Sequence, residues 1–406
     1  MSELASGPAP VREAERIVAL DVLRGLAILG ILVMNVQALS MPFAGYSNLG
    51  VVEDPSTTDY WVWGFAHLFA ETKFMTLFSI LFGAGAALLL DRLESKGLPA
   101  ATVHYRRAAG LLLIGCAHAY LLWYGDILTA YALCSLLLYP LRRLGARTLA
   151  IAGLVILCLS PVVGWGLSQS PPEVKGFLLG DMASWQTTLD QETAAYQGGW
   201  LDQAAHRTPT SWFIQTRAFV LFIFWRAFGL MLLGMALYKW RVITAGRSPG
   251  FYRRLAWWSL VPGLAISIAG MAIILHHDFA DRITERVNPF ANYFGSLGMS
   301  LGYLALVMLW CQSARRGPLQ TSLAAVGRMA LTNYLLQTVL CILVFYGGYG
   351  LGLFGQVSRL GQLGIVAAVW GFELLISPWW LAHFRFGPAE WLWRSMTYLK
   401  PQPMRR

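Results

Sequence analysis

Long apolar segments, separated by short polar connections, most strongly constrain how this chain can fold. A helix needs about 20 consecutive apolar residues to cross the hydrocarbon core of a bilayer. The chain is 56% hydrophobic and only 13% charged, and its mean hydropathy is +0.53. We therefore expect an all-α polytopic membrane protein with about ten transmembrane helices, and soluble classes are excluded. The expected spans cover residues 17–39, 61–90, 108–123, 126–141, 147–167, 211–238, 255–275, 290–311, 322–345 and 362–382.

The distribution of basic residues predicts how the chain is oriented. Most of the 31 lysines and arginines fall on one side of the membrane if the amino terminus is cytoplasmic. Cytoplasmic loops carry this excess in membrane proteins, so both termini are expected in the cytoplasm. Topology thus accounts for the net charge of +10, and we expect membrane lipids as partners and no nucleic acid. The five cysteines lie inside apolar segments without paired spacing, which predicts neither disulfides nor a metal site.

Hydropathy divides the chain into bundles, a loop and tails. The loop mixes aromatic residues such as Trp185 with acidic ones such as Asp190, so we expect short amphipathic helices over the outer mouth. Tryptophans beside basic residues in the carboxyl-terminal tail favour a helix lying in the inner interface. The expected parts are a cytoplasmic tail (1–16), an amino-terminal bundle of five spans (17–167), an extracytoplasmic loop (168–210), a carboxyl-terminal bundle of five spans (211–382) and an interfacial cytoplasmic tail (383–406).

Asp21, Arg24 and Asn35 lie on one stripe of the first apolar segment. With about 100° of rotation per residue, Arg24 and Asn35 fall within about 60° of Asp21. At about 1.5 Å per residue the stripe is about 21 Å long, which is most of the hydrocarbon thickness. Burying a charge at that depth costs at least a few kcal/mol. We therefore expect this face to meet protein or water and not lipid.

A histidine and an aspartate flank the tight turn between the third and fourth segments. His118 falls late in the third segment and Asp126 in the turn, both toward the external side. A neutral imidazole can act as general base on a hydroxyl or amine, and a carboxylate can orient it. The alternative is structural: His118 hydrogen-bonds a neighbouring helix and Asp126 caps the fourth helix.

The second segment carries His67, Glu71 and Lys73 before a run that contains Gly83 and Gly85. At about thirty residues it is too long for one straight crossing, so we expect a bend or an interfacial first half near Glu71. Lys73 either attracts an anionic group of a substrate or snorkels to the outer headgroups. The two glycines fit close helix contact better than phosphate binding, because no Lys-Ser/Thr follows them.

A polar face marks the start of the ninth segment. Arg328 lies near its inner end, and Asn333 and Gln337 follow four residues apart. These side chains either form hydrogen bonds between helices or wall a polar cavity in which Arg328 attracts phosphate. Glu373 is the remaining deep carboxylate, and Arg226 is a candidate partner for it.

Three groups of motifs carry a family resemblance: Leu20–Asn35; Lys73–Gly85 with His118–Leu128; and Gly327–Thr338 with Gly387–Arg394. Together they resemble the YeiB-like family of bacterial inner-membrane proteins. The resemblance covers nearly the whole chain, and the last pair of motifs is the most specific to the family. It implies a multi-pass protein of the bacterial inner (plasma) membrane.

More distantly, residues 16–147 resemble the amino-terminal part of transmembrane acyltransferases of the heparan-α-glucosaminide N-acetyltransferase type. In those enzymes a catalytic histidine follows the asparagine in the luminal mouth, whereas here that position falls on or near Tyr46. If acyl transfer takes place here, His118 or alternatively His67 must supply the base. The shared pattern consists of Asp21, Arg24, Gly25 and Asn35.

The resemblance favours transfer of an acyl (acetyl) group from cytoplasmic acyl-CoA to an extracytoplasmic or lipid-linked acceptor. Acetyl-CoA would then be a co-substrate, and no permanently bound cofactor is expected. His118 with Asp126 would deprotonate the acceptor, and Asn35 would supply an oxyanion donor. The residues expected to bind substrate or CoA are Arg16, Asp21, Arg24, Lys73, Arg328, Asn333 and Gln337.

Two other functions stay open from the sequence. One is a transporter of a small organic solute or lipid, which ten helices with buried polar groups also suit, although the chain has no internal repeat. The other is a membrane protein that binds a ligand without turnover. The expected partners are membrane lipids and a small-molecule, glycan or lipid acceptor, and the sequence is compatible with a homodimer.

Overall fold

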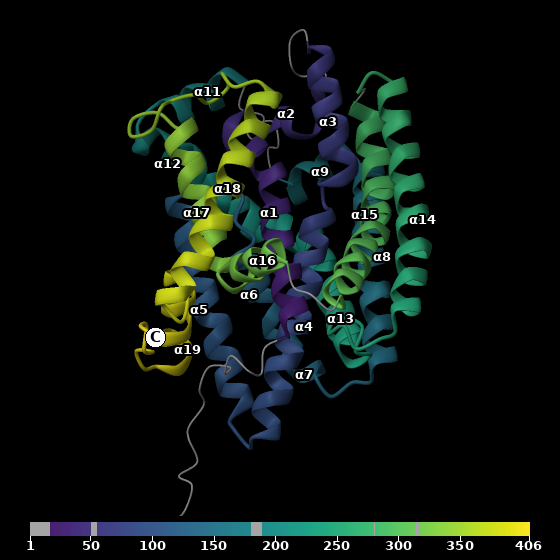
Figure 1. The fold of residues 1–406 in the computed structure, drawn as a ribbon. Coiled ribbons are helices and arrows are strands. Elements are labelled where there is room, and N and C mark those ends of the chain that lie inside the picture. Colours follow the sequence, from purple (N-terminus) through teal and green to yellow (C-terminus); the bar gives the residue numbers. More distant parts are fainter. Residues whose placement is uncertain (1–16, 50–54, 180–188, 280, 314–316) are drawn as a thin grey trace, which may run out of the picture.

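The computed structural model describes residues 17–49, 55–179, 189–279, 281–313 and 317–406. Helices form the regular secondary structure of these residues, apart from one isolated bridge between Phe384 and Arg405. Figure 1 shows the long helices running roughly side by side, with the start of the first helix and the carboxyl terminus at the same end. We call this the terminal end and the opposite one the loop end. The expected all-α polytopic fold is confirmed.

The helices follow one another along the chain with short connections. Their order is α1 (Val18–Ser40), α2 (Ala44–Ser47), α3 (Thr57–Phe69), α4 (Lys73–Ser95), α5 (Ala100–Leu121), α6 (Leu128–Leu136), α7 (Leu138–Leu141), α8 (Ala146–Gln169), α9 (Pro172–Leu179), α11 (Leu189–Gln197), α12 (Trp200–Phe213), the π-helix η3 (Ile214–Ile223), α13 (Phe224–Lys239), α14 (Pro249–His276), α15 (Asp281–Cys311), α16 (Pro318–Arg328), α17 (Ala330–Phe345), α18 (Arg359–His383) and α19 (Pro388–Tyr398).

Seven spans in the described chain, or eight if one bent pair counts as a span, are long and apolar enough to cross a membrane. The expected number of about ten is therefore not confirmed. Two of the expected spans account for the difference. α5 carries Arg106 and Arg107 near its start, which lowers its hydropathy. α6 has only 9 residues and ends at a break near Leu137, so it is too short for a crossing.

The first helix lies at the centre of the molecule. In the most apolar stretch of α1, 72% of the residues are buried, compared with 22% in α14. A Cβ atom on Gly25 would collide with the carbonyl oxygen of Leu323, and one on Gly327 would collide with that of Asp21. The backbones of α1 and α16 therefore touch. The stripe that carries Asp21 and Arg24 faces protein, as expected, because other helices surround α1.

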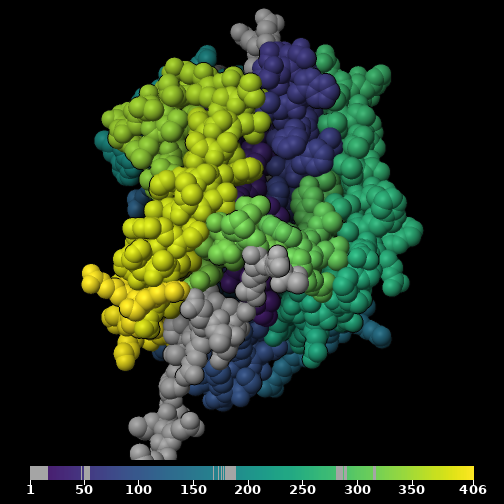
Figure 2. All heavy atoms as spheres, viewed as in Figure 1, coloured from purple at the N-terminus to yellow at the C-terminus, as the bar shows by residue number. Residues whose placement is uncertain are grey.

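The ninth apolar segment is broken, although we expected one continuous helix over residues 322–345. α16 ends at Arg328 and α17 begins at Ala330, and the two helices meet at an angle of 85°. Figure 2 shows α16 crossing the face of the molecule between α18 and the α14–α15 pair. Arg328 and the residues of α17 therefore do not share one straight face, which corrects the sequence prediction.

Two further expectations on irregular segments are met. The second apolar segment is interrupted between α3 and α4, where Thr72 has a left-handed φ of 63°, so the irregularity near Glu71 is confirmed. In the loop over 168–210, α9, α11 and α12 are the expected short helices, while Trp185 lies outside the described residues. Figure 1 shows α11 and α12 at the loop end of the bundle.

Candidate functional site

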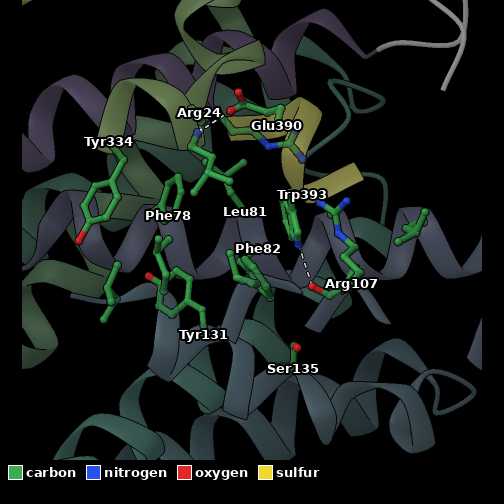
Figure 3. A pocket seen from close by; sticks show the side chains of 18 of the residues that line it. Arg24, Phe78, Leu81, Phe82, Arg107, Tyr131, Ser135, Tyr334, Glu390 and Trp393 are labelled. Atoms are coloured by element: carbon green, nitrogen blue, oxygen red, sulfur yellow. Dashed lines mark hydrogen bonds between the residues drawn. The ribbon is translucent and has the colours of Figure 1, made fainter. Parts of the chain in front are cut away.

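A cavity of about 180 Å³ opens among α1, α4, α5, α6, α16, α17 and α19. It lies toward the terminal end, because early residues of α1 and α5 and the tail helix α19 line it. Figure 3 shows how side chains from these helices converge on it. The lining consists of Arg24, Ile31, Phe78, Leu81, Phe82, Gly85, Ala86, Leu89, His104, Arg107, Ala108, Leu111, Ile127, Leu128, Tyr131, Ser135, Gly327, Arg328, Ala330, Leu331, Tyr334, Glu390, Trp393 and Arg394.

The cavity lining is strongly basic. Arg24, Arg107, Arg328 and Arg394 all contribute to it, and Glu390 is the one acidic side chain among the lining residues. Guanidinium groups bind phosphate and carboxylate through paired, charge-assisted hydrogen bonds. A cavity with this excess of positive charge therefore suits a ligand with an anionic group. Two of these arginines, Arg24 and Arg328, were predicted as binding residues from the sequence.

Arg24 reaches the cavity because its neighbours orient it and leave it room. Its Nη1 donates to Oδ1 of Asp21, one helical turn earlier, at 3.2 Å. A Cβ on Gly85 of α4 would lie 3.0 Å from Nη2 of Arg24, so glycine makes the space that the guanidinium uses. The side chain of Arg24 is 30% exposed, whereas that of Asp21 is 9% exposed. Asp21 thus orients Arg24 and does not line the cavity itself.

Arg107 and Trp393 join α5 to the tail helix α19. The guanidinium carbon of Arg107 lies 3.6 Å from the centroid of the Trp393 ring, a cation–π geometry. The indole N–H of Trp393 donates to the backbone carbonyl of Arg107 at 2.7 Å, as Figure 3 shows. These contacts hold both side chains in the cavity wall. Sequence reasoning missed them, although the Arg106–Arg107 pair and the tryptophan-rich tail were visible signals.

Glu390 caps the start of α17 beside the break. Its Oε1 accepts from the backbone N–H of Leu331 at 2.7 Å and from that of Thr332 at 3.2 Å, and its Oε2 accepts from the Thr332 hydroxyl at 2.6 Å. The first N–H groups of a helix need such acceptors when they are buried. Burial raises the pKa of the Glu390 carboxyl above its usual value. The tail predicted to lie in the membrane interface thus also closes the cavity and stabilises the broken helix.

The other wall of the cavity is apolar and aromatic. The rings of Phe78 and Phe82 on α4 lie 5.8 and 5.2 Å from the ring of Tyr131 on α6. Figure 3 shows Tyr131 and Tyr334 on the side of the cavity away from Arg107. A ligand that fits both walls has an anionic group at one end and an apolar group at the other.

His118 and Asp126 form a buried pair next to this apolar wall. Nδ1 of His118 lies 2.9 Å from Oδ1 of Asp126, and Nε2 lies 3.0 Å from the hydroxyl oxygen of Thr338. Oδ2 of Asp126 accepts from the backbone N–H of Thr129 at 2.8 Å, so the aspartate also caps α6. The ring of Tyr334, which lines the cavity, lies 5.1 Å from that of His118. The structural and functional readings of Asp126 are therefore compatible.

Besides Asp21, three residues predicted to bind substrate or CoA do not line the cavity. Lys73 is fully buried and donates to the carbonyl of His67 at 2.7 Å and to the Asn292 side-chain oxygen. Asn333 and Gln337 are buried and contact α18 instead. Lys73 therefore does not snorkel to a surface, and the three residues pack helices together.

The other residues singled out from the sequence also lie away from the cavity or outside the described residues. Asn35 is partly exposed on α1 and does not line the cavity, while Arg16 lies outside the described residues. Arg226 donates to the hydroxyls of Thr76 and Ser296 at 2.7 and 2.8 Å. The candidate pair between Arg226 and Glu373 is therefore wrong. His67, the alternative base, lies on α3, contacts Glu71 in the connection between α3 and α4, and lies outside the cavity lining.

These features define a helical membrane protein with a basic, aromatic-lined interior cavity, and comparisons place it in a family. Residues 237–400 match the family described as "Protein of unknown function (DUF418)". The chain is 34% identical to YeiB of Escherichia coli (strain K12) over 393 residues, which cover 94% of this chain and 96% of YeiB. It is 33% identical to YxaH of Bacillus subtilis (strain 168), with 97% of each chain covered.

A third relative, the 39.9 kDa protein in the amylase 3′ region of Bacillus acidopullulyticus, is 27% identical, with 97% of each chain covered. The chain therefore belongs to the YeiB-like family, as the sequence motifs indicated. No solved structure matches it. Two of the motifs on which the resemblance rested lie at the cavity: Gly327–Thr338 contains the break between α16 and α17, and Gly387–Arg394 contains Glu390, which caps α17.

Proposed function

We propose that this protein is an integral membrane acyltransferase that moves an acyl group from cytoplasmic acyl-CoA to an acceptor on the other side of the bacterial inner membrane. In this proposal the terminal end faces the cytoplasm, so both termini are cytoplasmic. The basic residues at this end support that orientation. The N-acetyltransferase-like pattern of Asp21, Arg24 and Asn35 supports the class of reaction.

The observation that carries the proposal is the order of groups along the cavity. Arginines line the terminal side, where the phosphates of CoA would bind, and aromatic side chains line the far side, where a thioester arm would fit. On α5, Arg107 and His118 are eleven residues apart, which corresponds to about 16 Å along the helix. The acid–base pair therefore lies beyond the apolar wall, where the acyl group would arrive.

The proposed step balances with these residues. The acceptor hydroxyl attacks the thioester carbonyl, a C–O bond forms and the C–S bond breaks. Nε2 of His118 accepts the hydroxyl proton and passes it to the departing CoA sulfur, while Asp126 holds the Nδ1–H and stabilises the imidazolium. The acceptor displaces the Thr338 hydroxyl, which occupies Nε2 in the structure.

Thermal-shift measurements on detergent-purified protein test the proposal. Acetyl-CoA and CoA are expected to raise the melting temperature, because they bind the folded state. Arg24→Ala should weaken the affinity about tenfold to a hundredfold, since it removes charge-assisted hydrogen bonds. Arg253→Ala, which changes an exposed arginine on α14, should leave the affinity unchanged.

Turnover separates catalysis from binding. His118→Ala should still show the thermal shift with acetyl-CoA. With water as the acceptor, the wild type should release the free thiol of CoA from acetyl-CoA, and this variant should not. Purified protein that neither binds nor cleaves any acyl-CoA would contradict the proposal.

A transporter is the second candidate, because broken helices are typical of transporter binding sites. The 85° break between α16 and α17 is such a feature. However, Glu390 already occupies the start of α17, where a transported anion would bind. Solute uptake into proteoliposomes without thioester cleavage would favour the transporter.

A further inference from the structure

A second polar group lies deep between α17 and α18 and is not used by the proposed acyl transfer. It consists of Asn333, Gln337, Glu373 and Ser377, which we call the polar seam. Each of the four is at most 2% exposed. Nε2 of Gln337 donates to Oε2 of Glu373 at 2.9 Å, and Nδ2 of Asn333 donates to the Ser377 hydroxyl at 3.1 Å. The seam thus contains two hydrogen bonds between α17 and α18, which lie one helical turn apart on each helix.

Glu373 is a carboxylate without a compensating cation in the described residues. It lies about 21 Å from the start of α18 and about 15 Å from its end, so it is near the middle of the span. Among the described residues it forms no ion pair, and its hydrogen-bond partner is the side chain of Gln337. A buried ionised carboxylate at this depth is strongly unfavourable unless a cation or a proton neutralises it.

Three oxygen atoms of the seam are buried and have no hydrogen-bond donor among the described residues. They are Oδ1 of Asn333, Oε1 of Gln337 and Oε1 of Glu373. Leaving a buried acceptor unsatisfied costs about 1–3 kcal/mol. A proton on Glu373 would neutralise the charge, but its single O–H can donate to only one of the two amide oxygens and leaves the other without a donor. A metal cation bound in the seam would offer these oxygens a partner and would neutralise the carboxylate at the same time.

The ligand set indicates which cation fits. All the candidate ligands are oxygens, from one carboxylate, two carboxamides and a hydroxyl, which is the donor chemistry of hard cations. The seam carries the single negative charge of the Glu373 carboxylate, and a monovalent cation neutralises it. Mg²⁺ keeps several waters, which a site with no exposed surface does not supply. We propose that the polar seam is an intramembrane Na⁺-binding site, held by Glu373, Gln337 and Asn333.

The test measures melting temperature of the full-length protein in detergent, with NaCl replaced stepwise by choline chloride at constant ionic strength. Na⁺ is expected to raise the melting temperature by several degrees and to saturate, because it binds the folded state. Glu373→Gln should abolish this dependence. Glu94→Gln, a matched change at an exposed carboxylate on α4, should retain it.

Direct binding of ²²Na⁺ to the wild-type protein keeps the test independent of how well the variant folds. One ion per chain, displaced by unlabelled Na⁺, is expected. No bound ²²Na⁺, or an unchanged Na⁺ response in Glu373→Gln, would overturn the proposal. A melting temperature that responds to pH but not to Na⁺, with the response lost in Glu373→Gln, would assign the seam to a proton instead. Acyl-CoA binding is measured separately, so either proposal can fail alone.

Discussion

Glu192 is a buried carboxyl at the loop end, outside the membrane-spanning segments. It is 7% exposed, and its Oε2 accepts from the backbone N–H of Phe43 at 3.1 Å. Burial raises the pKa of Glu192 from 4.5 to about 7, and the hydrogen bond opposes part of this change. The contact joins α11 to the start of α2. The protonation state of one residue therefore affects how this end of the molecule is held.

The raised pKa of Glu192 predicts a pH dependence of stability. The folded state holds a proton that the unfolded state has released, so stability falls as pH rises from about 4.5 to about 7 and is level above that. Glu192→Gln cannot titrate and should lack this change. The measurement is the melting temperature of the wild type minus that of the variant, at each pH from 4.5 to 8. The titration of all other groups is common to both proteins and cancels in this difference. If the melting temperature of the wild type minus that of the variant stayed constant or rose with pH, the prediction would be contradicted.

The sequence identified some site residues and missed others for a physical reason. Arg24 and His118 stand out because an ionisable group inside an apolar segment is costly unless it has a use. Arg107 and Trp393 do not stand out, since each lies at a segment end where polar and aromatic residues are ordinary. Their contact joins residues 286 positions apart. Only the tertiary fold brings the two segments together.

At the scale of elements, the crossing of α1 and α16 depends on two glycines. Gly25→Ala and Gly327→Ala would each place a Cβ against a backbone oxygen of the facing helix, and backbone cannot yield as a flexible side chain does. Overpacking of this kind costs about 1–3 kcal/mol. Both variants should lower the melting temperature and, because Gly327 lines the cavity, alter ligand binding.

Gly371→Ala is the matched control for these variants. It also replaces a helical glycine in a span, but no atom lies within 4 Å of the added Cβ. Its melting temperature should stay equal to that of the wild type or rise, because alanine favours the helix. If all three variants behaved alike, the close contact of α1 and α16 would not be what limits stability.

The cap on α17 gives a second prediction at this scale. Glu390→Ala removes the acceptor for two backbone N–H groups and one hydroxyl, and should destabilise the protein by about 1–3 kcal/mol. Glu390→Gln keeps one acceptor oxygen and should lose less. Chemical denaturation of the purified variants measures the free energy of unfolding of each and shows which loses more. Equal losses in both would mean that the charge of Glu390, and not its hydrogen bonds, carries the cap.

The broken helix shows why elements are only partly predictable. Hydropathy identified the apolar segments, including the ninth, because burial in lipid or protein requires apolar residues. It did not indicate the break near Met329, since the residues on both sides are ordinary helix formers. The break is stabilised by contacts from elsewhere: the backbone of α1 at Gly327, and Glu390 of α19 at Leu331.

At the scale of the whole molecule, both described ends of the chain and the cavity lie toward the same side. Figure 1 shows the carboxyl terminus and α19 at the terminal end, with α11 at the loop end. The basic residues predict that the terminal end faces the cytoplasm. A ligand made in the cytoplasm would then reach Arg107 and Arg394 first. Orientation in the membrane therefore decides which compartment supplies the ligand.

Cysteine labelling in cells tests this orientation. In a variant whose five cysteines are replaced, Gln356→Cys places a thiol at an exposed position of the loop end, and Lys400→Cys places one at the terminal end. A membrane-impermeant maleimide should label Gln356→Cys in spheroplasts. It should label Lys400→Cys only after permeabilisation if the terminal end faces the cytoplasm, as the distribution of basic residues predicts.

The two positions control for each other, since both are polar, exposed and outside the helices that span. Labelling of both after permeabilisation shows that each thiol is reactive, so a difference in intact spheroplasts reports sidedness alone. The reverse pattern would put the arginines on the outer surface. Acyl-CoA could not then be the ligand of the cavity, because it is cytoplasmic, whereas the Na⁺ site in the polar seam would be unaffected.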